Sequence, residues 1–197
     1  MKNDRLEAIL PPKHPANGLK DKSLKQNINY ASKTHGRIKS GEGSLIGNAG
    51  EHYVVAELLK QGVIAALTPR NTPAFDILAT KGKVSARIRV KTKSEQYDHF
   101  QWNIKKDGTI FREISRNNDF IVLVNLKTKL ERPDFFIVPT MQINRWPVSE
   151  YKKWLKTPGK NNRPHSPDNK QRHLSFKKFE KVLIAKYSDN WGAILMK

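Results

Sequence analysis

Hydrophobic and polar residues alternate in short blocks along most of the chain, and these blocks predict a succession of helices and strands. In residues 46–61 the apolar positions recur near the 3.6-residue period of a helix, and the following Gly62 is typical of a helix end. The predicted packing stripe consists of Val54, Val55, Leu58 and Leu59. Residues 63–68 are apolar enough to predict a mostly buried strand after this helix.

Residues 75–93, FDILATKGKVSARIRVKTK, predict two strands joined by a tight turn at residues 81–83. On the second strand Ile88 and Val90 are apolar, so strand alternation places the cations on the opposite face. These cations are Arg87, Arg89, Lys91 and Lys93. Asp76, early on the first strand, can pair with Lys91: a carboxylate binds a hard cation, and an ammonium binds an anion or orients a water. The simpler interpretation is a hairpin with one solvated basic face.

Three further strands follow from the same patterns. Residues 119–126, DFIVLVNL, predict the most buried strand of the protein, and residues 134–139 predict another. Residues 100–104 predict a strand that continues into a hairpin turn at residues 106–109.

The last third of the chain predicts two helices separated by a loop. The first helix covers residues 141–155, with an interruption at Pro147. Residues 157–173, rich in proline and cations, predict a basic loop, and residues 175–186 predict the second helix. The packing side of that helix would carry Phe176, Phe179, Val182 and Leu183. The tail at residues 191–195 is expected to dock on the domain.

Composition adds a strong preference for polyanions. The 197 residues include 37 lysines and arginines against 18 aspartates and glutamates, for a net charge of +19, and nucleic acid is the first candidate partner. A membrane surface is a weaker candidate, because no basic amphipathic helix has a clean apolar face. The chain has no cysteine, which excludes disulfides, a thiol nucleophile and cysteine-ligated zinc.

The chain divides into an arm and one domain. Residues 1–43 are polar, basic and interrupted by prolines, and they predict a flexible arm, either a plain linker or a segment that follows a phosphate backbone. Residues 44–197 are long enough to form one folded domain with a C-terminal helical extension. No apolar run suits a signal peptide or a bilayer span, so we expect a cytoplasmic protein.

The order of these features resembles the PD-(D/E)xK nuclease superfamily, to which many restriction endonucleases and Holliday-junction resolvases belong. The resemblance covers residues 47–126 and depends on GEHY at residues 50–53, FDIL at residues 75–78 and IRVKT at residues 88–92. It implies an α/β fold with a mixed central sheet flanked by helices. It also places Glu51, Asp76 and Lys91 at the catalytic positions, with Asp76 and Glu51 toward Mg²⁺ or Mn²⁺.

Arg89 departs from the pattern of this superfamily, which has glutamate, aspartate or glutamine at that position. A guanidinium cannot ligate a metal and stays protonated at working pH. Asp76 and Glu51 could hold Arg89 in an ion pair and leave a basic groove without catalysis. Alternatively, Arg89 swings aside to bind a phosphate, while the two carboxylates keep one metal.

The leading hypothesis is therefore a metal-dependent endonuclease that binds duplex DNA and hydrolyses its phosphodiester bonds. A non-catalytic DNA-binding module on the same fold is the alternative, and a basic protein of a ribonucleoprotein particle is a third interpretation. A homodimer is compatible with the first, because enzymes that cut both strands are commonly two-fold dimers. The cations expected to contact nucleic acid are Lys81, Lys83, Arg87, Arg89 and Lys93.

Overall fold

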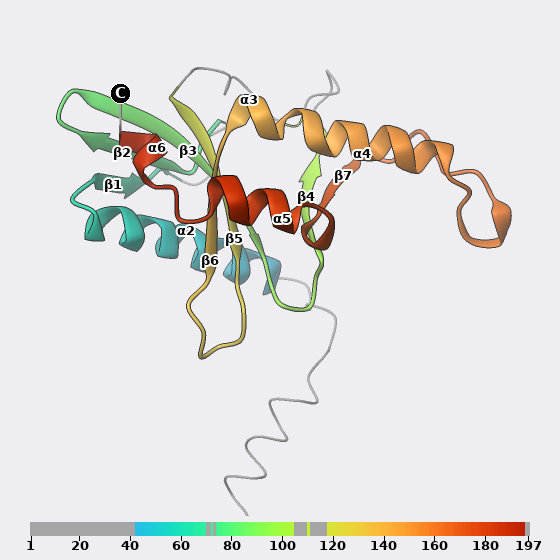
Figure 1. The fold of residues 1–197 in the computed structure, drawn as a ribbon, viewed down its shortest axis with the longest axis horizontal. Helices are drawn as coiled ribbons and strands as arrows, with labels where there is room; N and C mark the ends of the chain where they lie inside the picture. The colour runs from blue at the N-terminus through green and yellow to red at the C-terminus, as the bar shows by residue number, and fades with distance from the viewer. Residues whose placement is uncertain (1–41, 70–71, 73, 105–109, 111–117, 196–197) are drawn as a thin grey trace, which may run out of the picture. The chain divides into compact units, whose positions relative to one another are not determined.

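The computed structural model describes residues 42–69, 72, 74–104, 110 and 118–195, all of them within one compact unit, Ile38–Lys197. The predicted arm therefore lies almost entirely outside the described residues, as does the predicted turn at residues 106–109. The elements, drawn in Figure 1, follow in the order α2 (Glu42–Lys60), β1 (Ile64–Leu67), β2 (Ile77–Lys81), β3 (Val84–Lys93), β4 (His99–Asn103), β5 (Asp119–Asn125), β6 (Asp134–Pro139), α3 (Thr140–Ile143), α4 (Arg145–Lys156), η1 (Lys160–Asn162), β7 (Gln171–Ser175), α5 (Phe176–Tyr187) and α6 (Gly192–Leu195).

Five strands form the central sheet in the order β1-β2-β3-β5-β6. Strands β1, β2 and β3 are antiparallel neighbours, β3 and β5 run parallel, and β6 is antiparallel to β5. Strands β4 and β7 pair with each other in a separate antiparallel ribbon. The predicted α/β class, with a mixed central sheet flanked by helices, is confirmed.

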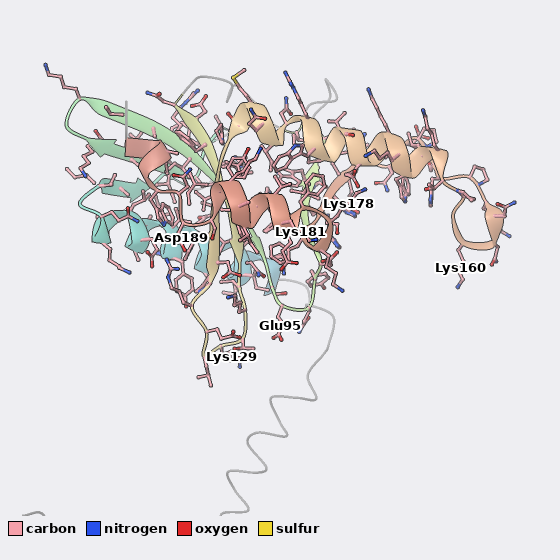
Figure 2. All side chains as sticks on the ribbon, viewed as in Figure 1. Glu95, Lys129, Lys160, Lys178, Lys181 and Asp189 are labelled. Carbon is pink, nitrogen blue, oxygen red and sulfur yellow. The ribbon has the colours of Figure 1, made fainter. Side chains whose placement is uncertain are left out.

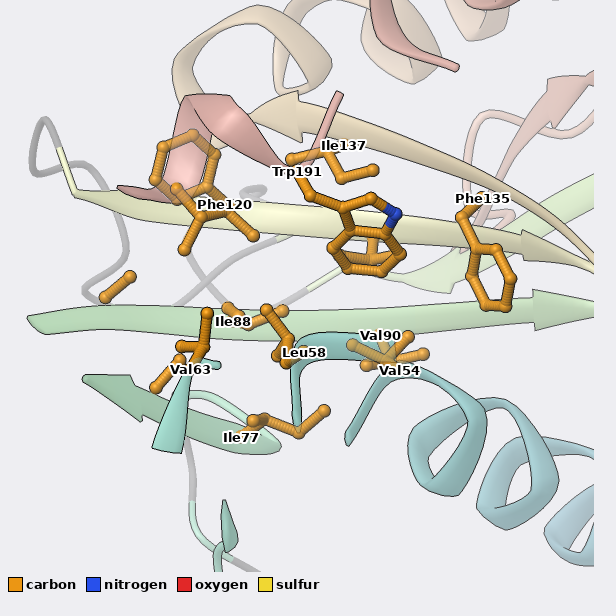
Figure 3. Close-up of a cluster of buried hydrophobic side chains, with 14 of the residues drawn as sticks. Val54, Leu58, Val63, Ile77, Ile88, Val90, Phe120, Phe135, Ile137 and Trp191 are labelled. Carbon is orange, nitrogen blue, oxygen red and sulfur yellow. The ribbon is translucent and has the colours of Figure 1, made fainter. Parts of the chain in front are cut away.

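One face of the sheet packs against α2 and α6. Val54 and Leu58 of α2 are fully buried against Ile88 and Val90 of β3, and Trp191, just before α6, closes the same cluster (Figure 3). The predicted docking of the tail is thus confirmed, as is most of the predicted helical stripe. Leu59 is the exception, with 54% of its surface exposed.

The other face of the sheet packs against α4, α5 and the β4–β7 ribbon. Ile121 and Leu123 of β5 are fully buried there, together with Phe100 and Leu174 of the ribbon and Leu183 of α5. Residues of α5 follow the predicted packing side except Val182, which is 40% exposed. No helix in the described ranges combines the length and the apolar character that crossing a bilayer requires.

Two local predictions about strand and helix ends need correction. Strand β1 was predicted to be mostly buried, but Ile64 is 70% exposed, because β1 lies at the edge of the sheet and only β2 pairs with it. The interruption predicted at Pro147 falls at Asn144, between α3 and α4. Proline cannot donate to the carbonyl four residues earlier, that of Ile143, which accounts for a division at this place.

Residues 157–173 were predicted to form a loop, and this prediction was wrong for the last residues, because β7 begins at Gln171. Arg172 and Leu174 are buried and Gln171 and His173 are exposed, which is the alternation of a strand. The following helix begins as the sequence predicted, because the Ser175 hydroxyl accepts a hydrogen bond from the Lys178 backbone N–H at 3.3 Å.

Candidate functional site

A pocket of about 420 Å³ opens where α2, β3 and β4 meet. Glu51, Asp76, Arg89 and Lys91 all contribute to its wall. The residues that line it are Gly43, Ile46, Gly47, Glu51, Asp76, Arg89, Val90, Lys91, Thr92, Lys93, Ser94, Tyr97, His99 and Gln101. The fold therefore brings Glu51 and Lys91, which are 40 positions apart in the sequence, to the same surface depression.

Gly50 positions α2 over β3. A Cβ atom on Gly50 would lie 1.9 Å from the Thr92 hydroxyl oxygen, so only glycine allows this approach. Gly50 is buried, and the next residue of the helix, Glu51, is half-buried at the pocket. The close contact between Gly50 and Thr92 thus fixes how near Glu51 comes to the strand that carries Lys91.

Asp76 lies directly before β2 and is held in place by β3. The pair Ile77↔Ile88 extends by one residue to place Asp76 opposite Arg89. The Val90 backbone N–H donates to Asp76 Oδ2 at 2.8 Å, and Arg89 Nε lies 3.4 Å from the same oxygen. Asp76 is consequently both oriented and ion-paired, which is the first of the two arrangements that the sequence left open for Arg89.

The other cations of β3 do not form a solvated basic face. Arg87 donates two hydrogen bonds of 2.7 Å to the buried Asp119 at the start of β5. Lys93 is only 7% exposed, and its ammonium lies 4.8 Å from the centre of the Phe176 ring. The simpler interpretation of the hairpin is therefore wrong for β3, because residues far away in sequence pair with or cover its cations.

Lys93 titrates in an unusual environment. Burial lowers the pKa of Lys93 below its ordinary value, and the carboxylates of Asp98 and Asp134 oppose this shift. An ammonium in this position is costly to bury, and a nearby anion would offset part of that cost. Lys93 also lines the pocket, so an anion there would approach it.

The remaining predicted contacts lie elsewhere. Lys81 and Lys83 are exposed at the turn between β2 and β3, where Gly82 adopts a φ of 59°, and neither lines the pocket. Arg87 is likewise absent from the pocket wall. Strand β4 supplies residues that the sequence did not predict for the site, His99 and Gln101. Their signal was weak, because the partner strand β7 was predicted as loop.

The pocket has the donor set of a simple magnesium site. Among the described residues no group of three or more histidines, aspartates or glutamates could hold a metal ion. Glu51 and Asp76 nevertheless give the wall two carboxylates. Magnesium is commonly bound by one or two protein carboxylates, with waters and substrate phosphate completing its shell, so this pair fits such an ion.

Comparisons with known proteins give several similar solved structures, two of which are described here. No protein-family model and no curated protein matches the sequence. The chain is similar to Hjc, a Holliday junction resolvase from the archaeal hyperthermophile Archaeoglobus fulgidus, with 16% identity, a TM-score of 0.37, and coverage of 75% of this chain and 99% of that chain. It is also similar to the bacterial homing endonuclease I-Ssp6803I, with 15% identity, a TM-score of 0.41, and coverage of 77% of this chain and 90% of that chain.

Proposed function

We propose that this protein is a metal-dependent endonuclease of the PD-(D/E)xK type that hydrolyses phosphodiester bonds in duplex DNA. The observation that supports this function best is the meeting of Glu51, Asp76 and Lys91 at one pocket. The net charge of +19 supports a polyanionic substrate. The proposal treats residues 44–197 as the nuclease domain and residues 1–43 as a basic arm that adds phosphate contacts.

In this proposal each pocket residue has a distinct task. Asp76 and Glu51 would hold Mg²⁺ or Mn²⁺, which when bound polarises a phosphodiester and lowers the pKa of a water. Lys91 places a positive charge beside the phosphate, where it neutralises the charge that develops on the phosphoryl oxygens. The hydrogen bond from the Val90 N–H keeps the Asp76 carboxylate aimed at the pocket. Arg89 would leave Asp76 and contact a phosphate when substrate enters.

A second function, DNA binding without cleavage, is supported by the Arg89–Asp76 ion pair. Arg89 Nε is 3.4 Å from Asp76 Oδ2, and both side chains are largely buried, at 26% and 19% exposed. A guanidinium held in this way occupies the place that a metal would take beside the carboxylate. In that case the pocket would bind a phosphate through Lys91 and would need no divalent cation.

Plasmid nicking by the full chain tests the proposal. In Mg²⁺ or Mn²⁺ we expect supercoiled plasmid to become nicked, and we expect EDTA, Asp76→Asn and Lys91→Ala each to reduce the rate at least about a hundredfold, because each removes electrostatic stabilisation of the reacting phosphate. Lys129→Ala is the matched control, since Lys129 is an exposed lysine outside the pocket and is not among the cations expected to contact DNA. Gel shifts in EDTA should show that the variants still bind DNA.

The outcomes separate the two functions. Cleavage that depends on metal, Asp76 and Lys91 supports the nuclease. Salt-sensitive DNA binding without any cleavage in either metal refutes the nuclease and supports the binding module. Cleavage that survives Asp76→Asn and Lys91→Ala would come from a contaminant or another site and would also refute the proposal.

A further inference from the structure

The β4–β7 ribbon has one apolar face and one polar face. Its register pairs Phe100 with Leu174 on the buried face. The alternate positions point away from the core, and they pair His99 with Ser175, Gln101 with His173 and Asn103 with Gln171. Of these six, Gln101, Asn103, Gln171 and His173 are exposed. The outer face therefore carries three side-chain amides, with a pair of stacked imidazoles whose ring centres are 4.4 Å apart.

The ribbon is firmly attached to the domain. The Arg172 guanidinium lies 3.3 Å from the centre of the Tyr151 ring on α4 and donates hydrogen bonds to the carbonyls of Asn169 and Gln171 at 2.6 and 2.8 Å. At the other end, the Asp98 carboxylate accepts hydrogen bonds from the Ser175 hydroxyl at 2.8 Å and from the Lys177 N–H at 3.0 Å. Side chains on the outer face are thus presented by a preorganised support, which lowers the entropic cost of recognition.

The outer face is continuous with the pocket. His99 and Gln101 belong both to this face and to the wall that contains Asp76 and Lys91. Cations also adjoin the ribbon: Lys170 is exposed immediately before β7, and Lys177 is exposed two residues after β7 ends. Figure 2 shows Lys178 and Lys181 on the neighbouring α5, and both are exposed. A polyanion that placed a phosphate in the pocket would therefore run beside the amides, with positive charge on its flank.

We propose that the β4–β7 ribbon is a sequence-reading element that enters the major groove of duplex DNA, with Gln101, Asn103 and Gln171 contacting base edges. This inference rests on the proposed binding of duplex DNA at the pocket, and it holds for either function proposed above. The major groove admits a two-stranded ribbon, and glutamine and asparagine amides form paired hydrogen bonds with the N6 and N7 atoms of adenine.

The dimensions of the ribbon suit this task. Alternate residues on a strand are about 6.7 Å apart, which is close to the rise of about 6.8 Å over two base pairs. Gln101 and Asn103 lie at this spacing on β4, and Gln171 lies opposite Asn103 on β7. The ribbon would accordingly read a short site, adenine-containing, a few base pairs from the phosphate held in the pocket.

Selection from a random duplex DNA library tests the inference. The full chain is used in EDTA, so that the result does not depend on cleavage. We expect a short motif containing adenine to be enriched, and Gln101→Met and Gln171→Met to bind that motif about tenfold more weakly. For Gln171→Met, which lies outside the wall of the pocket, the affinity for unrelated duplex DNA should stay unchanged. Gln61→Met is the matched control, because Gln61 is an exposed glutamine immediately after α2, outside the ribbon.

A modified base sharpens the test. Replacing adenine in the selected motif by 7-deazaadenine removes the N7 acceptor, so it should weaken wild-type binding by about tenfold and leave Gln101→Met or Gln171→Met unaffected. Melting curves verify that the variants are folded. Any of three results would overturn the inference. The selection enriches no motif, the ribbon variants bind the enriched motif as well as the wild type does, or the protein prefers branched DNA of any sequence. Failure of the nuclease alone would instead appear as an absence of nicking with the motif intact.

Discussion

Arg89 decides whether the Asp76 carboxylate is available to a metal ion. It lies 3.4 Å from Asp76, and the half-buried Lys91 stands two residues further along the same strand. The ion pair orients Asp76 but competes with any cation for it. The competition is electrostatic, so it can be changed without disturbing the hydrogen bond from the Val90 N–H.

Replacing Arg89 by glutamine should therefore increase metal-dependent nicking, by about tenfold, because the carboxylate then binds Mg²⁺ without first giving up a guanidinium. The measurement is the plasmid nicking rate as a function of Mg²⁺ concentration, with Lys129→Gln, at an exposed lysine outside the pocket, as the control for loss of one positive charge. A rate that falls in Arg89→Gln would indicate that the phosphate contact proposed for Arg89 outweighs its competition with the metal for Asp76.

Lys93 offers a second prediction at this scale, concerning stability. Its folded-state pKa is lowered by burial, so the folded protein holds this proton less tightly than the unfolded chain does, and stability rises with pH toward the ordinary lysine value of 10.5. Lys93→Met removes the buried charge and should stabilise the protein by about 1 kcal/mol near pH 7. The gain should shrink as the pH is raised toward 10.5.

Thermal unfolding of Lys93→Met and wild type from pH 7 to 10 checks this expectation. Lys83→Met serves as the comparison for the replacement of a lysine by methionine at an exposed position. Destabilisation by Lys93→Met at every pH would mean that the contact with the Phe176 ring outweighs the cost of burial.

Helix α2 is placed by a single small residue. A methyl group at Gly50 would collide with Thr92 at 1.9 Å, whereas one at Gly47, a turn earlier, meets nothing within 4 Å. Gly50→Ala should lower the free energy of unfolding by about 1–3 kcal/mol, because the added methyl group overpacks the contact. Gly47→Ala should raise the free energy of unfolding by about 0.5–1 kcal/mol, because alanine has a better helix propensity than glycine. Urea unfolding of the two variants measures the difference in their free energies of unfolding. If Gly50→Ala stabilised the protein as Gly47→Ala does, the proposed close approach would be contradicted.

Local patterns predicted the elements that carry their own signal. Strand β5 is buried along its whole length and apolar between Asp119 and Asn125, and the helix before Gly62 carries Val54, Val55, Leu58 and Leu59 at helical spacing, so both were predicted from the sequence alone. Strand β7 was missed because its residues, QRHLS, contain only one apolar side chain. Its burial comes from β4 and α4, which neighbour it only in the folded chain. The predicted burial of β1 was wrong although its residues are apolar, since its place at the edge of the sheet, rather than its composition, decides its exposure.

The candidate site shows the same limit. The residue types and their order predicted that Glu51, Asp76 and Lys91 would meet, and they lie at one pocket. The exposure and pairing of the other cations depend on residues that are distant in the sequence. Asp119, 32 positions after Arg87, accepts hydrogen bonds from it, and Phe176 covers Lys93. No pattern within β3 encodes those contacts.

For the whole molecule, the net charge of +19 predicts strong salt dependence of DNA binding. The logarithm of the affinity should fall by about 0.9 per phosphate contact for each tenfold increase in salt. Removing residues 1–41 should reduce that slope, because the arm is proposed to contact phosphates, while the preferred motif should stay the same. Fluorescence anisotropy over a series of salt concentrations measures the slope for the full and the shortened chain, and an unchanged slope would exclude the arm from the interface.

The ribbon has a consequence for the order of events during synthesis. Its outermost pair, His99 and Ser175, joins residues 76 positions apart, so β4 waits for most of the domain to leave the ribosome before it finds its partner. Pairings of such long range close late, because the intervening chain must first be ordered. A nascent chain that already exposes Asp76 and Lys91 would still lack one wall of the pocket. The complete pocket would thus form only after β7 has been synthesised and has paired with β4.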